Sequence, residues 1–234
     1  MLLGQATIDA RLAIKPESNS ILFSQPENSL LVRDALEFAD KRWKNAGTHM
    51  IEERNTDEYR FKSNCAIGYK AEIAVAYFMH AWFAFPQVQP DSQIYDEVMK
   101  KNFLHDLDYP LLDSSLPPVS VKSCDNTTKR WCGYSWTFQY ANKKSSGGTD
   151  PIFSGNFDER LLVAMVYMDD VYASEVYIQC LAPMKTLLEY KNSILLKDPQ
   201  KESLVGIKKC IYLENLIEFY DDLNDNNAWV WYAI

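Results

Sequence analysis

Two short segments near the middle of the chain carry the residues best suited to chemistry. Asp108 precedes an apolar run at 109–112, and Ser120 and Lys122 stand two apart in the run at 119–123. If the runs pair as a hairpin, Asp108 lies alongside Ser120 and Lys122, which share a strand face because side chains alternate. A carboxylate that holds Mg²⁺, beside a lysine that steadies charge on phosphate, is the minimum equipment for metal-assisted phosphodiester hydrolysis. An acid and a lysine on neighbouring strands are also common as a surface ion pair.

Two further acids compete with Asp108 for the role of metal ligand. Asp106 comes two residues earlier, and Asp113 directly follows the first run. We prefer Asp108 because an apolar strand follows it directly, whereas Asp113 leaves too few residues for a relaxed hairpin before Ser120. Mg²⁺ takes oxygen ligands and keeps several waters, so two or three carboxylates and a backbone carbonyl suffice, and Mn²⁺ can substitute.

A helix expected over residues 66–79 contains another candidate acid. The segment is apolar nearly all round and interrupted by Lys70 and Glu72, which predicts a buried central helix. Burying the Glu72 carboxylate without a partner costs several kcal/mol, so Glu72 needs a cation, a donor network or an opening to solvent. A salt bridge or a position at the water-exposed end of the helix explains the same residue without any chemistry.

The surrounding elements predict an α/β or α+β fold with a mixed central β-sheet flanked by helices. Amphipathic spacing predicts a helix at 28–45 that Gly47 ends, and a shorter helix is expected at 93–104. Alternating or apolar runs predict strands at 109–112, 119–123, 134–140, 161–168 and 175–181. The run at 161–168 is apolar enough for the middle of a sheet, and a helix at 184–190 follows Pro183.

Two regions follow from this order of elements. Residues 1–60 are expected to form a helical N-terminal extension packed on the core. Residues 61–234 are expected to form the main domain, which ends in a C-terminal helical segment.

Composition limits the partners and the compartment. The chain shows no signal-peptide core and no run that could span a bilayer, so we expect no membrane partner and a cytoplasmic protein. A phage-encoded protein acting in the host cytoplasm fits equally. The five cysteines show no CxxC spacing and are expected to be reduced thiols rather than zinc ligands. The net charge of −8 argues against a broad electrostatic grip on DNA, although a nuclease needs only a local basic groove.

The order of these features resembles the PD-(D/E)xK nuclease superfamily, whose members share the restriction-endonuclease-like fold. Residues 68–76, GYKAEIAVA, are similar to the G-x-x-[AG]-E-x-A-x-A helix of many members. Residues 119–123, VSVKS, are similar to the strand that carries the (D/E)xK element. The resemblance extends over residues 66–190 and rests on three short motifs in the right order.

The resemblance implies a role for each matching residue. Glu72 would be a helix-borne ligand of metal or water, Asp108 the principal metal ligand, and Lys122 the catalytic lysine. Ser120 stands where the family usually has Asp or Glu, a departure for which Glu72 is the natural substitute. Gln139, on the next expected strand, is a candidate for orienting water or phosphate, although strand glutamines more often face solvent.

A group of cations close to these motifs is expected to contact DNA phosphates: Lys129, Arg130, Lys143 and Lys144. Trp131 and Trp136 lie between them and would either stack on bases or belong to the core and its rim. The Ser- and Gly-rich stretch at 142–151 is expected to be a mobile loop near the mouth of the site.

Three functions are compatible with the sequence. The first is a metal-dependent DNA endonuclease of a restriction, repair, mobile-element or phage kind. The second is a catalytically inactive nuclease-like module that binds DNA or a protein partner. The third is an unrelated acidic interaction protein in which Glu72 and Lys122 are structural. Each of the three admits a homodimer.

Overall fold

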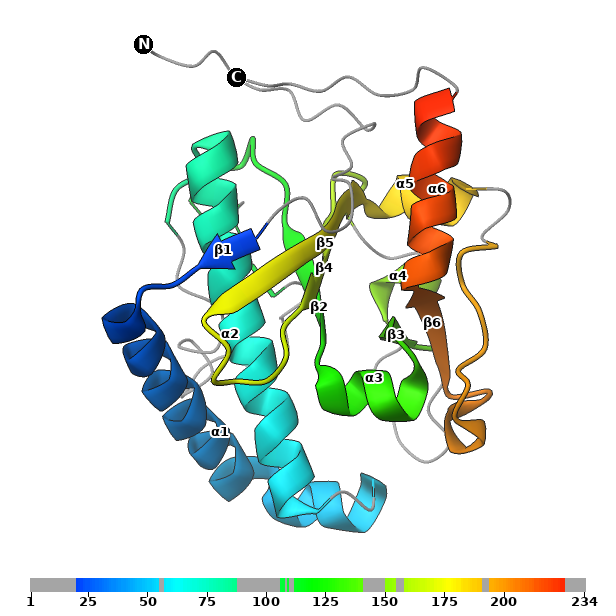
Figure 1. The fold of residues 1–234 in the computed structure, drawn as a ribbon. Helices are drawn as coiled ribbons and strands as arrows, with labels where there is room; N and C mark the ends of the chain where they lie inside the picture. The colour runs from blue at the N-terminus through cyan, green and yellow to red at the C-terminus, as the bar shows by residue number, and fades with distance from the viewer. Residues whose placement is uncertain are drawn as a thin grey trace.

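The computed structural model describes residues 20–54, 57–87, 106–107, 109, 112–140, 150–154, 158–190 and 194–225. Its centre is a four-stranded sheet in the order β1-β5-β4-β2 (Figure 1). The strands are β1 (Ser20–Leu22), β2 (Val119–Cys124), β4 (Leu162–Tyr167) and β5 (Glu175–Pro183). β2 and β4 run parallel, whereas the other two pairs are antiparallel. The mixed sheet that the sequence predicts is therefore confirmed.

Strand β4 lies between β5 and β2, and all six of its residues are buried. Both of its faces meet apolar side chains, as expected of a strand without a solvent-facing side. The side chains on one face belong to the core beneath helix α2, and they are Leu162, Ala164 and Val166. Those on the other face belong to a second core, and they are Val163, Met165 and Tyr167. The expectation that residues 161–168 lie in the middle of the sheet is confirmed.

Two long helices form the layer on the first face of the sheet. Helix α2 (Glu58–Phe83) packs Ala71, Ala74 and Val75 into the first core, which confirms the buried central helix. Helix α1 (Gln25–Arg54) packs along α2 (Figure 1). Gly47 does not end α1, which continues to Arg54. A glycine inside a helix costs only about 1 kcal/mol, less than packing along a neighbouring helix can recover.

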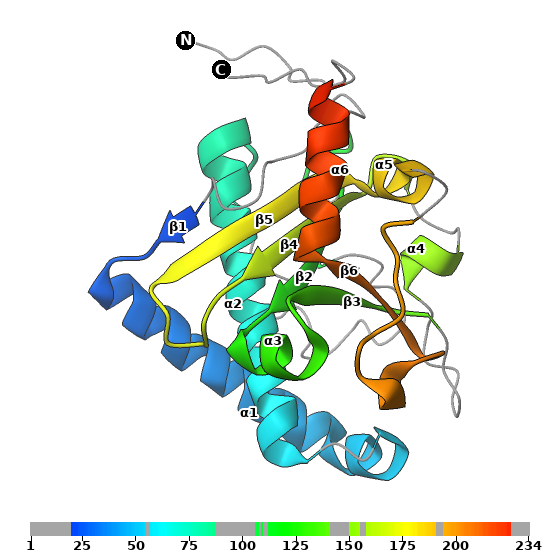
Figure 2. The same ribbon diagram turned by 45° about the vertical axis from the view of Figure 1, so that its right-hand side comes forward.

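A second layer covers the other face of the sheet. It contains an antiparallel pair of strands, β3 (Ser135–Gln139) and β6 (Lys208–Tyr212), and the helix α6 (Leu213–Asp225). These elements lie on the side of the sheet away from α2 (Figure 2). The fully buried Trp136 donates from Nε1 to the Val166 carbonyl at 2.9 Å, which fastens β3 to β4. Shorter helical segments complete the fold: α3 (Asn126–Cys132), α4 (Pro151–Ser154), α5 (Met184–Glu189) and η4 (Glu202–Leu204).

The expected hairpin before β2 takes a different form. Leu107 and Val119 exchange both backbone hydrogen bonds, at 2.9 Å each, as an isolated antiparallel bridge. Tyr109 belongs to a turn, because its carbonyl accepts from the amides of Leu112 and Asp113. The strand predicted at 109–112 is therefore wrong at its two described residues, since Tyr109 and Leu112 belong to this turn.

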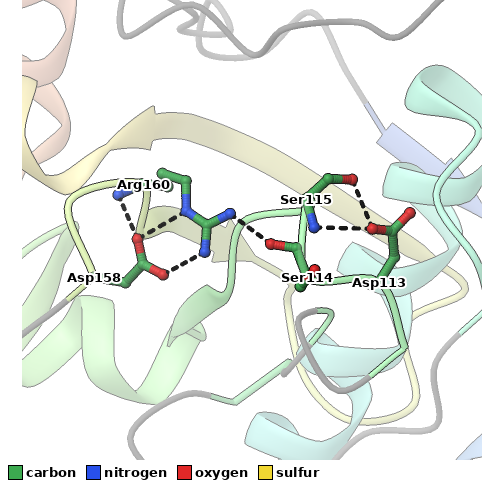
Figure 3. A network of polar contacts seen from close by, with 5 residues as sticks. All are labelled: Asp113, Ser114, Ser115, Asp158 and Arg160. Atoms are coloured by element: carbon green, nitrogen blue, oxygen red, sulfur yellow. Dashed lines mark hydrogen bonds and ion pairs between the residues drawn. The ribbon is translucent and has the colours of Figure 1, made fainter.

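A polar network fixes the start of β2 against the start of β4. The Asp113 carboxylate accepts from the amide and the hydroxyl of Ser115, which closes the expected turn. Arg160 forms a two-pronged ion pair with Asp158 and donates from Nη1 to the Ser114 carbonyl at 2.8 Å (Figure 3). The guanidinium thereby joins the turn before β2 to the turn before β4.

The N-terminal region contributes to the sheet as well as covering it. β1 pairs with β5 at the sheet edge, so this region supplies a strand in addition to a helix. The boundary expected at residue 60 falls within the first turn of α2. The helix expected at 93–104 lies outside the described residues.

A buried lysine ties α1 and α2 to the turn between β4 and β5. Lys70 is fully buried, and its ammonium donates to Asn28 Oδ1 at 2.5 Å and to the carbonyls of Val171 and Ala173. Burial lowers the pKa of Lys70 to about 8, against the opposing effect of Asp170. Near neutral pH the ammonium form still dominates and can supply all three donated protons.

We expect Lys70→Met to lower the free energy of unfolding by about 3 kcal/mol or more, because one buried and two partly buried acceptors lose their donor. Urea unfolding followed by circular dichroism measures this change. Lys62→Met on the same helix is the control, since Lys62 makes partly exposed ion pairs with Asp40 and Glu58 and its loss should cost much less than that of Lys70. Equal losses in the two variants would show that the Lys70 contacts do not hold the layers together.

Candidate functional site

The candidate site centres on Lys122, which β2 holds at the edge of the sheet. Lys122 pairs in register with Met165, so its side chain leaves β2 on the face of the second core, away from α2. Its ammonium lies 2.8 Å from Asp150 Oδ2, and these side chains are 20% and 6% exposed. The ammonium also lies 5.6 Å from the centre of the Phe138 ring. Lys122 is thus a largely buried cation with a carboxylate and an aromatic face as neighbours.

Asp150 is positioned by β3 and by the start of α4. Its amide donates to the Gln139 carbonyl at 2.8 Å, which attaches it to the end of β3. Its own carbonyl accepts from the Phe153 amide at 2.8 Å, so the residue stands at the entry to α4. Pro151 follows as the first helical residue, a position that tolerates its missing N–H. The backbone therefore fixes Asp150 with its carboxylate toward Lys122.

Asp106 is the acid that the structure places against β2. The bridge between Leu107 and Val119 brings Asp106 alongside the strand, where Oδ2 accepts from the Val121 amide at 2.6 Å. The Ser120 hydroxyl donates to the same oxygen at 3.2 Å. Asp108, the preferred acid, lies outside the described residues. The described acid beside Ser120 is thus Asp106, which the prediction from sequence placed below Asp108.

The two carboxylates decide the charge state of Lys122. Burial by itself would lower the pKa of the ammonium, but Asp150, and then Asp106, outweigh this effect and raise the pKa above its ordinary value. Lys122 is therefore protonated throughout the neutral range. A protonated lysine with two acids nearby is the charge pattern that phosphate chemistry with a divalent cation uses.

Glu72 lies on the other side of the sheet from Lys122. Its helix packs on the first core, whereas Lys122 faces the second. Burial raises the pKa of the Cys65 thiol, Arg42 opposes this, and Glu72 adds to it, which places Glu72 toward the packing of α1 on α2. The expectation that Glu72 shares a cleft with Lys122 is therefore not met, because the sheet stands between them.

The structure brings Gln139 to the site through its backbone rather than its side chain. The Gln139 carbonyl holds Asp150, while Nε2 donates to the Ile207 carbonyl at 3.3 Å. Phe138, the preceding residue, faces Lys122, and successive strand side chains point to opposite faces. The Gln139 side chain thus points away from the Lys122 ammonium.

The expected DNA contacts are placed in part. Lys129 and Arg130 are exposed on α3, and the Lys129 ammonium lies 4.5 Å from the centre of the Tyr134 ring. Lys143 and Lys144 lie outside the described residues, as does most of the loop expected at 142–151. The two expected contacts that the structure describes therefore lie together on α3, near the end of β2.

Asp150 was not predicted from the sequence, although a local signal for it exists. An aspartate directly before a proline is typical of the start of a helix, and Asp150-Pro151 opens α4 in this way. That signal predicts a cap but says nothing about Lys122, which is 28 positions away in the chain. The partner of the lysine could be found only from the packing of β3 over β2.

The cysteines and histidines offer no alternative metal centre in the part of the chain that is described. All five cysteines are free thiols, and burial raises the pKa of Cys124 and Cys180 to about 12 in both cases. No group of three or more His, Cys, Asp or Glu side chains gathers there in a way that could hold a metal ion. A cation at the Lys122 site would therefore depend on the two carboxylates together with water or phosphate oxygens.

Comparison with protein-family models, with curated proteins and with solved structures finds no match to this chain. Among the described helices, none has the length and apolar character needed to cross a membrane. The site must consequently be interpreted from its own geometry.

A double-mutant cycle tests this geometry without any assumption about function. Lys122→Met and Asp150→Asn should show a coupling energy of roughly 0.5–3 kcal/mol in urea unfolding, because the two groups form a largely buried ion pair. Lys122→Met and Glu72→Gln should instead be additive within about 0.5 kcal/mol, since the sheet separates them. Strong coupling between Lys122 and Glu72 would contradict the placement of Glu72.

Proposed function

We propose that this protein is a metal-dependent DNA endonuclease whose site consists of Lys122, Asp150 and Asp106. The observation that carries the proposal is the largely buried Lys122 ammonium with two carboxylates acting on it at the edge of β2. Such a site concentrates a fixed positive charge and cation-binding oxygens in a region of low dielectric constant, where both act strongly on a phosphate. The biological setting proposed is restriction, repair, a mobile element or a phage.

We also propose that the fold is restriction-endonuclease-like. The support is a mixed sheet with the helix carrying the GYKAEIAVA motif on one face and Ser120-Val121-Lys122 on an edge strand. In the family pattern the acid two positions before the lysine is a metal ligand. Here Ser120 occupies that position, and we infer that Asp150 supplies the missing carboxylate in place of Glu72.

The donor set fits Mg²⁺, with Mn²⁺ as a substitute. Mg²⁺ is usually held by one or two carboxylates, with waters and substrate phosphates completing its coordination. Among the described residues, the hydrogen bonds to Asp106 all use Oδ2, so Oδ1 can take a cation. Asp106 and Asp150 would hold the ion, which supplies activation of water and stabilisation of charge on the phosphate.

Lys122 would act on the substrate through its charge. Because its pKa is raised, the ammonium is a donor rather than a base, and it would stabilise the negative charge that develops on the phosphate. For this role the ammonium must exchange part of its contact with Asp150 for the substrate. Asp150 would release the ammonium more readily when part of its negative charge is compensated by a cation that it holds.

A catalytically inactive nuclease-like module is the second candidate. The observation in its favour is the direct ion pair between Lys122 and Asp150, which satisfies both charges without a cation. With Ser120 in place of an acid, a structural pair of this kind would preserve the fold after loss of catalysis. Such a module would bind DNA or a protein partner.

Cleavage of supercoiled plasmid with Mg²⁺, with and without EDTA, separates the two candidates. Asp106→Asn should abolish metal-supported cleavage because it removes a ligand oxygen. Lys122→Met should reduce the rate by orders of magnitude, corresponding to roughly 3–4 kcal/mol of lost transition-state stabilisation.

Calorimetric titration with Mg²⁺ distinguishes the roles of the same residues. Asp106→Asn and Asp150→Asn should weaken binding, while Lys122→Met should largely retain it. Glu72→Gln is the matched control and should leave cleavage and Mg²⁺ binding near the wild-type level. If the wild-type protein cuts neither plasmid, single-stranded DNA nor RNA with Mg²⁺ or Mn²⁺, the inactive module replaces the enzyme.

A further inference from the structure

A cleft with both polar and apolar lining opens beside the C-terminal half of β2. Its volume is about 590 Å³, within the usual range for ligand sites. The start of α2, helix α3, the end of β2 and residues 201–208 form its walls. Ser123 lines it, and because strand side chains alternate, the Ser123 side chain leaves β2 on the face toward α2, opposite to that of Lys122.

The edge of β2 that points away from β4 leads to this cleft. The amides of Val119 and Val121 point away from β4, because they donate to Leu107 and to Asp106. Backbone groups alternate along a strand, so the amide and carbonyl of Ser123 also point away from β4. The cleft therefore adjoins the same outer edge of β2 on which Asp106 lies, and Lys122 is reached around that edge.

The cleft is lined by cations although the whole chain is acidic. Arg60, Lys201 and Lys208 line it, and Arg60 is exposed at the start of α2. Each of the two aspartates in its walls caps the N-terminus of its own helix. Asp57 accepts from the Arg60 amide at 2.8 Å, and Asp125 accepts from the Thr128 amide at 2.7 Å. The remaining polar groups suit an anionic ligand.

Two large aromatic side chains stand exposed in the lining. Trp131 on α3 is 62% exposed, and Tyr59 on α2 is 85% exposed. Trp136, by contrast, is fully buried and belongs to the core. Exposed aromatic rings beside cations are the combination that binds bases by stacking and phosphates by charge. A duplex hides its base faces, whereas a single strand presents them.

We propose that this cleft binds single-stranded nucleic acid. Trp131 and Tyr59 stack on bases, and Arg60 and Lys201 contact the phosphates. The proposal that the cleft binds a single strand depends only on the residues that line the cleft. Its further role, to deliver a single strand along the β2 edge to Lys122, rests on the proposed nuclease function.

Fluorescence anisotropy with a labelled twelve-nucleotide thymidine oligonucleotide tests the binding. The measurement uses the full chain in EDTA, with the Lys122→Met variant alongside, so that cleavage plays no part. We expect the single strand to bind more tightly than a duplex of equal length. Trp131→Ala should weaken binding by about 5- to 100-fold, as loss of stacking on one base does, and Trp131→Phe should restore most of it.

Matched controls separate the cleft from the rest of the surface. Trp82→Ala removes a tryptophan of similar exposure, 60%, at the other end of α2 and should leave binding unchanged. Arg60→Glu and Lys201→Glu should each lower the slope of log affinity against log salt by about 0.7, whereas Arg33→Glu on α1 should not. Thermal unfolding by circular dichroism confirms that each variant is folded.

Several results would overturn the proposal. These are the absence of binding, equal affinity for the duplex, and equal effects of the Trp131 and Trp82 variants. If the protein cuts no plasmid but still binds the single strand, the nuclease proposal is wrong and the binding proposal stands. If the protein cuts plasmid and the Trp131 and Arg60 variants bind the single strand as well as the wild type does, the binding proposal is wrong and the nuclease proposal stands.

Discussion

Apolar packing against both faces of the central sheet is the constraint on which the rest of the structure depends. Helix α2 covers one face, and β3, β6 and α6 cover the other, so all six residues of β4 are buried. Ionisable groups cannot stay charged in such an interior without partners. They are therefore found where the packing ends, at the outer edge of β2 and in the turn between β4 and β5. The position of the candidate site follows from the core rather than from local sequence.

Periodicity in the sequence was sufficient to predict the elements that form this core. The apolar run at 161–168 and the nearly uniform helix around 66–79 correspond to β4 and α2 because each is buried over most of its surface. β1 and β6 were missed, β1 because its three residues are too few to form a pattern. Helix α3 had a usable signal in Asp125 and Gly133, which mark its two ends.

The lysine of the site could be predicted from the sequence, whereas its acids could be predicted only in part. Lys122 was identified because strand alternation fixes its face once β2 is recognised. The acid next to the strand depends on where the preceding segment pairs, and a bridge at Leu107 selects Asp106. Lys70 shows the same limit, since its acceptors lie 42 to 103 positions away in the chain. Sequence can indicate that a buried charge needs partners, but only the fold supplies them.

The small strand β1 determines which edge of the sheet is available to other molecules. β5 has nine residues and would otherwise present a long row of backbone donors and acceptors, a template for pairing with another chain. β1 covers part of that row by antiparallel pairing, and Phe23 extends the cover by donating to the Ser174 carbonyl. A chain lacking this strand would lose the packing of Ile21 on the first core and would leave the β5 edge open to pairing with another chain. The strand β1 thus joins two roles, since it completes the packing under α2 and limits edge-to-edge association.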